Sequence, residues 1–256
     1  MIMNREIAAA RKIVAEARRQ IPAELLAIGG RALYSPASTL VSGSRYYFLG
    51  LNPREAPRPE DPLSTITVEA DLKRLEEGII TEHGYLDEKW KDYPPGEAPI
   101  QVRGKQLFAL LAGGSHTAGV ALLRITPTSN VVLQRSTSEN ELTQSKGCSP
   151  EQLAWQYWPF HQAVIRQTGC DTIIAHAIGL ARKLARRLGL GEGLTRPSGW
   201  GGRFPSCYAW QLPQGPMLLA VPNLSRYRPD GSRQCALKAF FQEFVPNGSY
   251  VRQAPG

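Results

Sequence analysis

The sequence lacks the cysteine patterns that mark metal-binding and disulfide-stabilised proteins. Its 256 residues contain four cysteines, each at least 22 positions from the next. Without a CxxC pair, a zinc or iron–sulfur site has no local support. We therefore expect four reduced thiols, no metal site and no cofactor. The cysteines are Cys148, Cys170, Cys207 and Cys235.

Long apolar runs are also missing. Nothing in the chain resembles a transmembrane span, and the first 20 residues carry charges throughout and have no apolar core. A secretory signal needs such a core, so we expect none here. The hydrophobic fraction of 42% is enough for an ordinary core. We expect a cytoplasmic protein with no membrane partner.

Acidic residues are the scarcer kind of charge. Lys and Arg number 30 against 22 Asp and Glu, which gives a formal net charge of +8. A basic surface favours a polyanionic partner, because binding releases counterions from the polyanion. Charge therefore points to nucleic acid, although many proteins are basic without such a partner.

Short strand-like runs alternate with helical patterns along the chain. Strands are predicted at 45–50, 129–134, 171–176, 206–212 and 217–221, and helices at 4–20, 100–112, 151–168, 177–188 and 232–244. This alternation predicts one three-layer α/β domain over residues 1–256, with a mostly parallel central β-sheet flanked by helices. Residues 1–30 are predicted to form an N-terminal helical extension.

The segment 54–99 differs from the rest of the chain. It is rich in proline and charge, and it contains one plausible helix, around residues 66–77. A connection of this length inside a compact α/β domain is usually functional or mobile. We therefore interpret it as a long insertion.

Three asparagines lie at or near the ends of predicted strands: Asn52, Asn130 and Asn223. In open α/β sheets, ligands bind at the carboxyl ends of the strands. Asparagine is a poor strand former and a poor base, but its carboxamide pairs a donor with an acceptor and suits a nucleobase edge. The pattern favours base recognition. The alternative is structural, with Asn52 capping a turn and Asn130 bracing the sheet.

The same positions carry a family resemblance. The run Gly50-Leu51-Asn52-Pro53 resembles the first motif of the uracil-DNA glycosylase superfamily in its GxNP form, and Asn130 with the apolar residues after it resembles the base-reading strand. Residues 222–226 fall where the superfamily has its second motif, with Asn223 where a histidine is usual. The resemblance covers roughly residues 45–245. It is to the branches without an iron–sulfur cluster, and this chain resembles an atypical member.

The resemblance implies a monomeric DNA glycosylase, which hydrolyses the N-glycosidic bond of a flipped, damaged or modified pyrimidine. Its DNA would be double-stranded with a flipped nucleotide, or single-stranded. Asn52 would orient the attacking water, Asn130 would read the Watson–Crick edge of the base, and Asn223 would face the base oxygen. Gly50, Leu51 and Pro53 would complete the base pocket.

The resemblance also implies a DNA-binding loop at 225–228. Ser225, Arg226 and Arg228 would contact phosphates, and Tyr227 would wedge into the base stack. The alternative is an exposed basic turn. A flipped base also needs an aromatic floor, for which the candidates are Tyr85, Trp90, Tyr93 and Trp200.

The substrate follows from two departures. The segment 54–99 would border the base pocket, and Asn223 replaces the usual histidine. Together they favour a base other than plain uracil. The resemblance implies a candidate, because one branch of the superfamily excises bulky modified cytosines from phage DNA as a defence. Two rival interpretations stay open: a nucleic-acid-binding protein that kept the fold and lost the chemistry, and an α/β enzyme acting on a small nucleotide. His176, at another strand end, is more typical of a hydrogen-bonded structural histidine.

Overall fold

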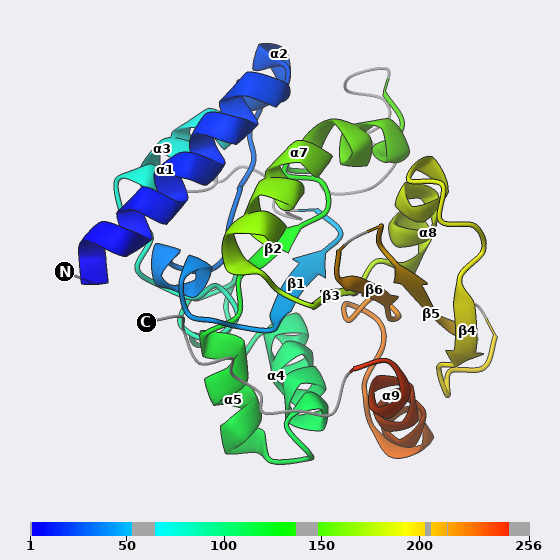
Figure 1. Cartoon of the computed structure of the whole chain (residues 1–256). Coiled ribbons are helices and arrows are strands. Elements are labelled where there is room, and N and C mark those ends of the chain that lie inside the picture. Colours follow the sequence, from blue (N-terminus) through cyan, green and yellow to red (C-terminus); the bar gives the residue numbers. More distant parts are fainter. Residues whose placement is uncertain (1, 53–64, 137–147, 203–205, 214, 246–256) are drawn as a thin grey trace.

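The computed structural model in Figure 1 is an α/β fold, in which helices cover both faces of a six-stranded sheet. It describes residues 2–52, 65–136, 148–202, 206–213 and 215–245. The prediction of an α/β fold with a mostly parallel sheet flanked by helices is confirmed.

The sheet has the strand order β2-β1-β3-β6-β5-β4. Its first four strands run parallel: β2 (Thr128–Asn130), β1 (Tyr46–Gly50), β3 (Thr172–Ala175) and β6 (Met217–Ala220). At the other edge, β5 (Ser206–Gln211) and β4 (Leu194–Pro197) pair antiparallel. The carboxyl ends of four adjacent strands therefore meet at one edge of the sheet, where ligands bind in such folds.

Successive strand residues face opposite helical layers, as the pleat of a strand requires. Tyr47, Leu49 and Ile173 belong to one apolar cluster, and Tyr46, Phe48 and Ile174 belong to another. The first cluster includes α1 (Ile2–Gln20), α2 (Ala23–Leu26), η1 (Ala37–Leu40), α3 (Val68–Glu76), α7 (Pro150–Thr168) and α8 (Ile178–Arg187). The second includes α4 (Pro99–Leu111), α5 (His116–Arg124) and α9 (Gly231–Phe244), which lie together below the sheet in Figure 1.

The helix α7 shows why several boundaries are predictable from sequence. The Ser149 hydroxyl accepts a hydrogen bond from the Gln152 backbone N–H, and the Gln152 side-chain oxygen accepts one from the Ser149 backbone N–H. Pro150 occupies the first turn. Gly169 ends the helix in the left-handed conformation, with φ 61°. These caps are local, so the predicted helix at 151–168 agrees with the structure.

The N-terminal region 1–30 packs as part of the first helical layer. Ala9, Ile13 and Val14 of α1 are buried in the same cluster as Tyr47 of β1. No single described helix has both the length and the apolar character needed to cross a membrane. Among the described helices, only α4 and α5 taken together meet both criteria, and this pair is bent by 105°.

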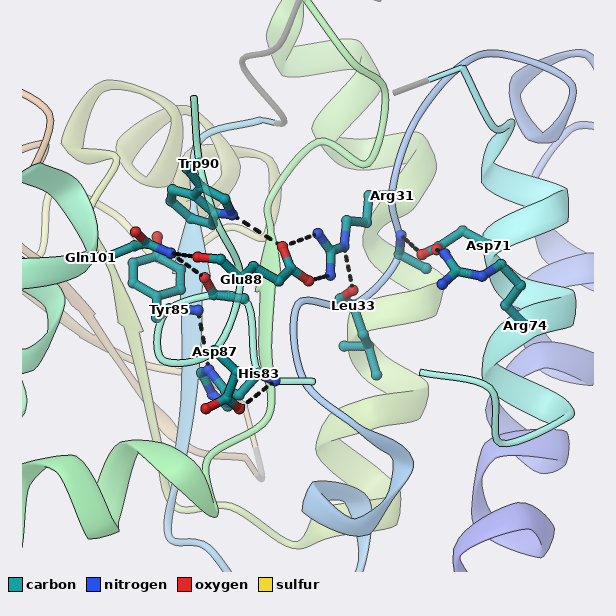
Figure 2. A network of polar contacts seen from close by, with 12 residues as sticks. Arg31, Leu33, Asp71, Arg74, His83, Tyr85, Asp87, Glu88, Trp90 and Gln101 are labelled. Carbon is teal, nitrogen blue, oxygen red and sulfur yellow. Dashed lines mark hydrogen bonds and ion pairs between the residues drawn. The ribbon is translucent and has the colours of Figure 1, made fainter. Parts of the chain in front are cut away.

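A buried ion pair ties the chain after α2 to the segment before α4. Arg31 Nη1 lies 2.7 Å from Glu88 Oε2, and Nη2 contacts the other carboxylate oxygen, so the pair is bidentate (Figure 2). Arg31 Nε donates to the Leu33 carbonyl at 2.9 Å, and Trp90 Nε1 donates to Glu88 at 3.0 Å. Burial alone would raise the pKa of Glu88, but the Arg31 guanidinium outweighs it and holds that pKa below its usual value.

Gln101 anchors the same segment to α4. Its Nε2 donates to the carbonyls of Gly84 and Glu88 at 2.6 and 2.9 Å, and its Oε1 accepts from the Ala98 N–H at 2.9 Å (Figure 2). The residues between 84 and 98 are therefore held at several points against α4 and the Arg31 segment.

Replacing Glu88 with glutamine should lower the free energy of unfolding by about 3 kcal/mol, because Arg31 would keep a buried charge without its partner. Both side chains are 14% exposed. Urea denaturation measures the change. The control is Glu77→Gln, which removes the exposed pair with Lys73 (side chains 45% and 63% exposed) and should change stability by less than about 0.5 kcal/mol. Equal changes in the two variants would contradict this assignment.

Candidate functional site

The candidate site is a row of residues at the carboxyl ends of the parallel strands. Gly50 of β1 pairs in register with Asn130 of β2. On the other side, the His176 N–H donates to the Leu49 carbonyl at 2.9 Å, which continues the pairing of β1 and β3 by one residue. Asn130, Gly50 and His176 therefore lie side by side.

Gly50 leaves room for its two neighbours to converge. A Cβ atom on Gly50 would lie 2.0 Å from Asn130 Oδ1 and 3.2 Å from His176 Nε2. Asn130 Oδ1 thus occupies the space that a Cβ at position 50 would fill, and His176 Nε2 lies in tight contact with it. Glycine is required here by close approach of side chains, since Gly50 is not among the residues with positive φ.

Asn52 lies two residues beyond Gly50. Its Nδ2 donates to the Ser136 carbonyl at 2.9 Å, which fixes the orientation of the carboxamide. The Val132 N–H donates to the Leu51 carbonyl at 3.1 Å, so β1 and β2 stay paired up to this point. Asn52 and Asn130 keep 9% and 7% of their surface exposed.

The remaining residues of the GLNP motif are Leu51 and Pro53. The Leu51 side chain packs on the cluster that contains Tyr47 and Leu49, on the opposite face of the sheet from Phe48. It therefore faces away from Asn130 and His176, which corrects the prediction that Leu51 completes the base pocket with them. Pro53 lies outside the described residues.

His176 is buried at the centre of the row. Its ring lies 5.2 Å from the Phe48 ring, and its Nε2 is 3.0 Å from the Tyr85 hydroxyl. Burial lowers the pKa of His176 to about 4, against the weaker opposing influence of its own backbone and the Asn223 side chain. The imidazole is therefore neutral at neutral pH.

Tyr85 brings the described part of the predicted insertion, residues 65–99, to the site. Of the four aromatic candidates, Tyr85 contacts the row through His176, and Trp90 packs edge-on against Tyr85 at 5.3 Å. Tyr93 is 43% exposed, and the Trp200 ring lies 5.4 Å from that of Tyr227. The geometry therefore favours Tyr85 and Trp90 as the aromatic wall.

Asn223 begins a tight turn after β6. Its Oδ1 accepts from the Ser225 N–H at 2.9 Å, and its carbonyl accepts from the N–H groups of Arg226 and Tyr227 at 3.0 Å. This turn presents Arg226 and Arg228 to solvent. The position of Asn223 beside His176 also places the turn next to the row.

The predicted wedge role of Tyr227 is wrong for this structure. Tyr227 is fully buried, and its hydroxyl donates to the Ser198 carbonyl at 2.6 Å. To enter a base stack, the ring would have to leave the core and break this bond. Tyr227 instead fixes the turn against the loop that follows β4.

Arg103 is a neighbour of this turn that the sequence did not reveal. From α4, its Nη1 donates to the Leu224 carbonyl at 2.6 Å. Burial and the nearby Arg228 charge lower the pKa of Arg103. Arg103 and Arg228 therefore lie close together, although 125 positions separate them in the sequence. Only the packing of α4 beside the turn brings them together.

The described part of the chain contains no group of three His, Cys, Asp or Glu side chains arranged to hold a metal ion. All four cysteines are free thiols.

No protein-family model matches the chain, and no curated protein matches it. The row offers neutral donors and acceptors on adjacent strands, which can hydrogen-bond a polar ligand.

Gly50→Ala should destabilise the protein by about 1–3 kcal/mol, because the new methyl group would overlap the Asn130 carboxamide. Thermal or urea denaturation measures the loss. Gly179→Ala in α8 is the matched control: a Cβ there meets nothing within 4 Å. That change should leave stability equal or raise it by up to about 1 kcal/mol. A stable Gly50→Ala protein with an unmoved Asn130 would refute the close approach.

Stability should fall as the pH is lowered from about 6.5 toward 5. Burial lowers the pKa of His83, His161 and His176 to about 4 each, below the unfolded value of about 6.5. In this window the unfolded chain binds protons that the folded protein does not, so each histidine contributes up to about 1.4 kcal/mol per pH unit. Urea midpoints between pH 7.5 and 5 test this, and a constant midpoint would disprove it.

Proposed function

We propose that the protein is a DNA glycosylase with a uracil-DNA glycosylase-like fold, which hydrolyses the N-glycosidic bond of a flipped pyrimidine nucleotide and leaves an abasic site. One observation carries the proposal. Asn130 Oδ1 and His176 Nε2 converge over Gly50, two residues before Asn52, at the carboxyl ends of adjacent parallel strands.

The strand order supports a single shared pocket. The GLNP motif follows β1, Asn130 ends β2, and Asn223 follows β6, and these strands belong to the parallel part of one sheet. Only β3 lies between β1 and β6, and its end carries His176. Residues distant in sequence thus present polar groups at one edge.

In the proposed reaction, a water oxygen attacks the sugar C1′ as the bond from C1′ to the base breaks and the base leaves with the bonding electrons. The proton that the water loses passes through solvent to the departing base, which leaves the sugar with a hydroxyl group. Asn52 would orient this water through its carboxamide oxygen, since an amide cannot accept the proton as a carboxylate would. The Ser136 contact to Asn52 Nδ2 sets that orientation. Asn130 would hold the base edge, where fixed neutral dipoles stabilise the charge that develops.

DNA would be the partner of the arginines around the Asn223 turn. Arg226 and Arg228 are exposed, and Arg103 lies beside them. Cationic side chains at such a rim would contact phosphates and fix the register of the strand, while the neutral row reads the base. The net charge of +8 supports the same partner.

The proposed substrate is a bulky modified cytosine, as in phage DNA. Two features support it over plain uracil: Asn223 stands where a histidine is usual, and Tyr85 from the long segment contacts the row. The second candidate function is nucleic-acid binding without chemistry. It is favoured by the absence of any ionised group among the described residues of the row, Asn52, Asn130, His176 and Asn223.

The test uses duplexes that carry uracil, 5-hydroxymethylcytosine or glucosylated 5-hydroxymethylcytosine, treated with alkali after incubation. After incubation with the wild-type protein, alkali should cut the strand at a modified cytosine. Asn52→Ala should lower the single-turnover rate by about 100-fold or more, while DNA affinity is retained. The readout is the fraction of cleaved strand over time.

A control variant separates binding from chemistry. Arg226→Ala combined with Arg228→Ala should weaken DNA binding and its dependence on salt, with an unchanged rate at saturating protein. Binding without strand scission on every duplex would favour the second candidate. Scission of the uracil duplex alone would eliminate the modified-cytosine substrate.

A further inference from the structure

Arg103 of α4 is a partly buried arginine that pairs with no carboxylate of the described residues. Its Nη1 donates to the Leu224 carbonyl at 2.6 Å, which is its one hydrogen bond to the described part of the chain. The buried Arg31, by contrast, has Glu88 as a bidentate partner. A guanidinium presents several N–H donors in a planar fork. Arg103 therefore keeps donors to which the described residues offer no anion.

A second guanidinium lies close to Arg103. Burial lowers the pKa of Arg103 most, the charge of Arg228 lowers that pKa further, and the opposing influence of Asp230 is weaker. The Asp230 carboxylate also lies 3.4 Å from Arg233 Nη1, so its negative charge is shared. Arg228 is exposed and makes no hydrogen bond or ion pair with a described residue. The charges of Arg103 and Arg228 therefore repel each other with little to neutralise them.

An anion bound by both arginines would relieve this repulsion. The guanidinium fork matches the geometry of a phosphate group, and hydrogen bonds between the two are charge-assisted and strong. A phosphodiester shares its negative charge between its non-bridging oxygens, so each arginine can contact one of them. Since Arg103 belongs to α4 and Arg228 to the turn after β6, a shared phosphate would connect these two elements.

The helix α4 also supports the aromatic wall of the site. Gln101 hydrogen-bonds the backbone of the segment that carries Tyr85, and a Cβ on Gly104 would lie 2.8 Å from the Tyr85 ring. Residues 101 and 104 are about one turn apart and share a face of the helix, whereas Arg103 is rotated by about 100° from residue 104. One side of α4 thus holds Tyr85, and another holds the Asn223 turn.

We propose that Arg103 and Arg228 bind the same phosphate of the DNA strand. One arm of the Arg103 guanidinium stays on the Leu224 carbonyl, and another N–H donates to a phosphate oxygen. This inference rests on the proposed glycosylase function and deepens it, because it assigns a strand contact to α4. Arg103 is also a positioning residue for Asn223, since it holds the next residue of the turn. A bound phosphate would fix α4 and this turn together beside the row.

The test measures affinity for duplexes in which a neutral methylphosphonate replaces one phosphate at a time around a glucosylated 5-hydroxymethylcytosine. Asn52→Ala is the background, so that no base is excised during the measurement. At one position the replacement should weaken binding about 10-fold, because charge-assisted hydrogen bonds are lost. Adding Arg103→Ala or Arg228→Ala should reduce this loss to about 3-fold or less, and adding both should abolish it. Fluorescence anisotropy gives the dissociation constants.

Arg11→Ala is the matched control. Arg11 is exposed on α1, in the other helical layer, and makes no hydrogen bond or ion pair with a described residue. Its replacement removes the same charge but should keep the full sensitivity to the methylphosphonate. Urea denaturation verifies that the variants are folded. Since Arg228 is exposed, Arg228→Ala decides the question if Arg103→Ala does not fold.

A purely structural Arg103 would weaken binding when replaced but would keep the sensitivity at that phosphate. Undiminished sensitivity in Arg103→Ala or Arg228→Ala would therefore overturn the inference. A series in which no single phosphate matters, or an equal reduction in Arg11→Ala, would also overturn it. These results leave the proposed function intact if the wild type excises a base. If the arginines share a phosphate but the wild type excises no base from any duplex, the proposed function fails and the phosphate site stands.

Discussion

The arrangement of the site depends on the glycine at position 50. Because Gly50 has no Cβ, Asn130 and His176 from the two flanking strands can approach within the space that a larger residue would fill. The parallel register places these three residues in one line, and β1 continues past Gly50 to Asn52. Every polar group assigned to base recognition or water orientation is arranged around this point. A methyl group there would separate them.

Charge is distributed so that the row stays neutral and its surroundings do not. The ionised pair Arg31–Glu88 is bidentate and buried, and with Gln101 it holds the segment that carries Tyr85. The arginines beside the Asn223 turn are at the rim. A neutral row costs less to desolvate than an ionised one, and in the proposed function the exposed arginines would supply the long-range attraction for DNA.

Sequence alone was sufficient where the signal is local. The caps of α7 and the strand that ends at Gly50 follow from neighbouring residues. The strand predicted at 129–134 is instead the shorter β2, which ends at Asn130. Sequence was insufficient where tertiary packing decides. The four exposed residues of β4 have no alternating pattern, so this strand was not predicted. The helix α5, which follows a pair of glycines, was not predicted either. Tyr227 has the aromatic side chain expected of a wedge residue, but it is buried. Arg103 contacts the turn only because α4 packs beside it.

The central claim is that a flipped base binds at the carboxyl ends of β1 and β2, against Asn130. A crystal structure of the Asn52→Ala protein with a duplex containing a modified cytosine tests it most directly. The account predicts an extruded base beside Asn130, with its Watson–Crick edge within hydrogen-bonding distance of the Asn130 carboxamide. A nucleotide that remains stacked in the duplex, or a base bound away from Gly50, would contradict the account.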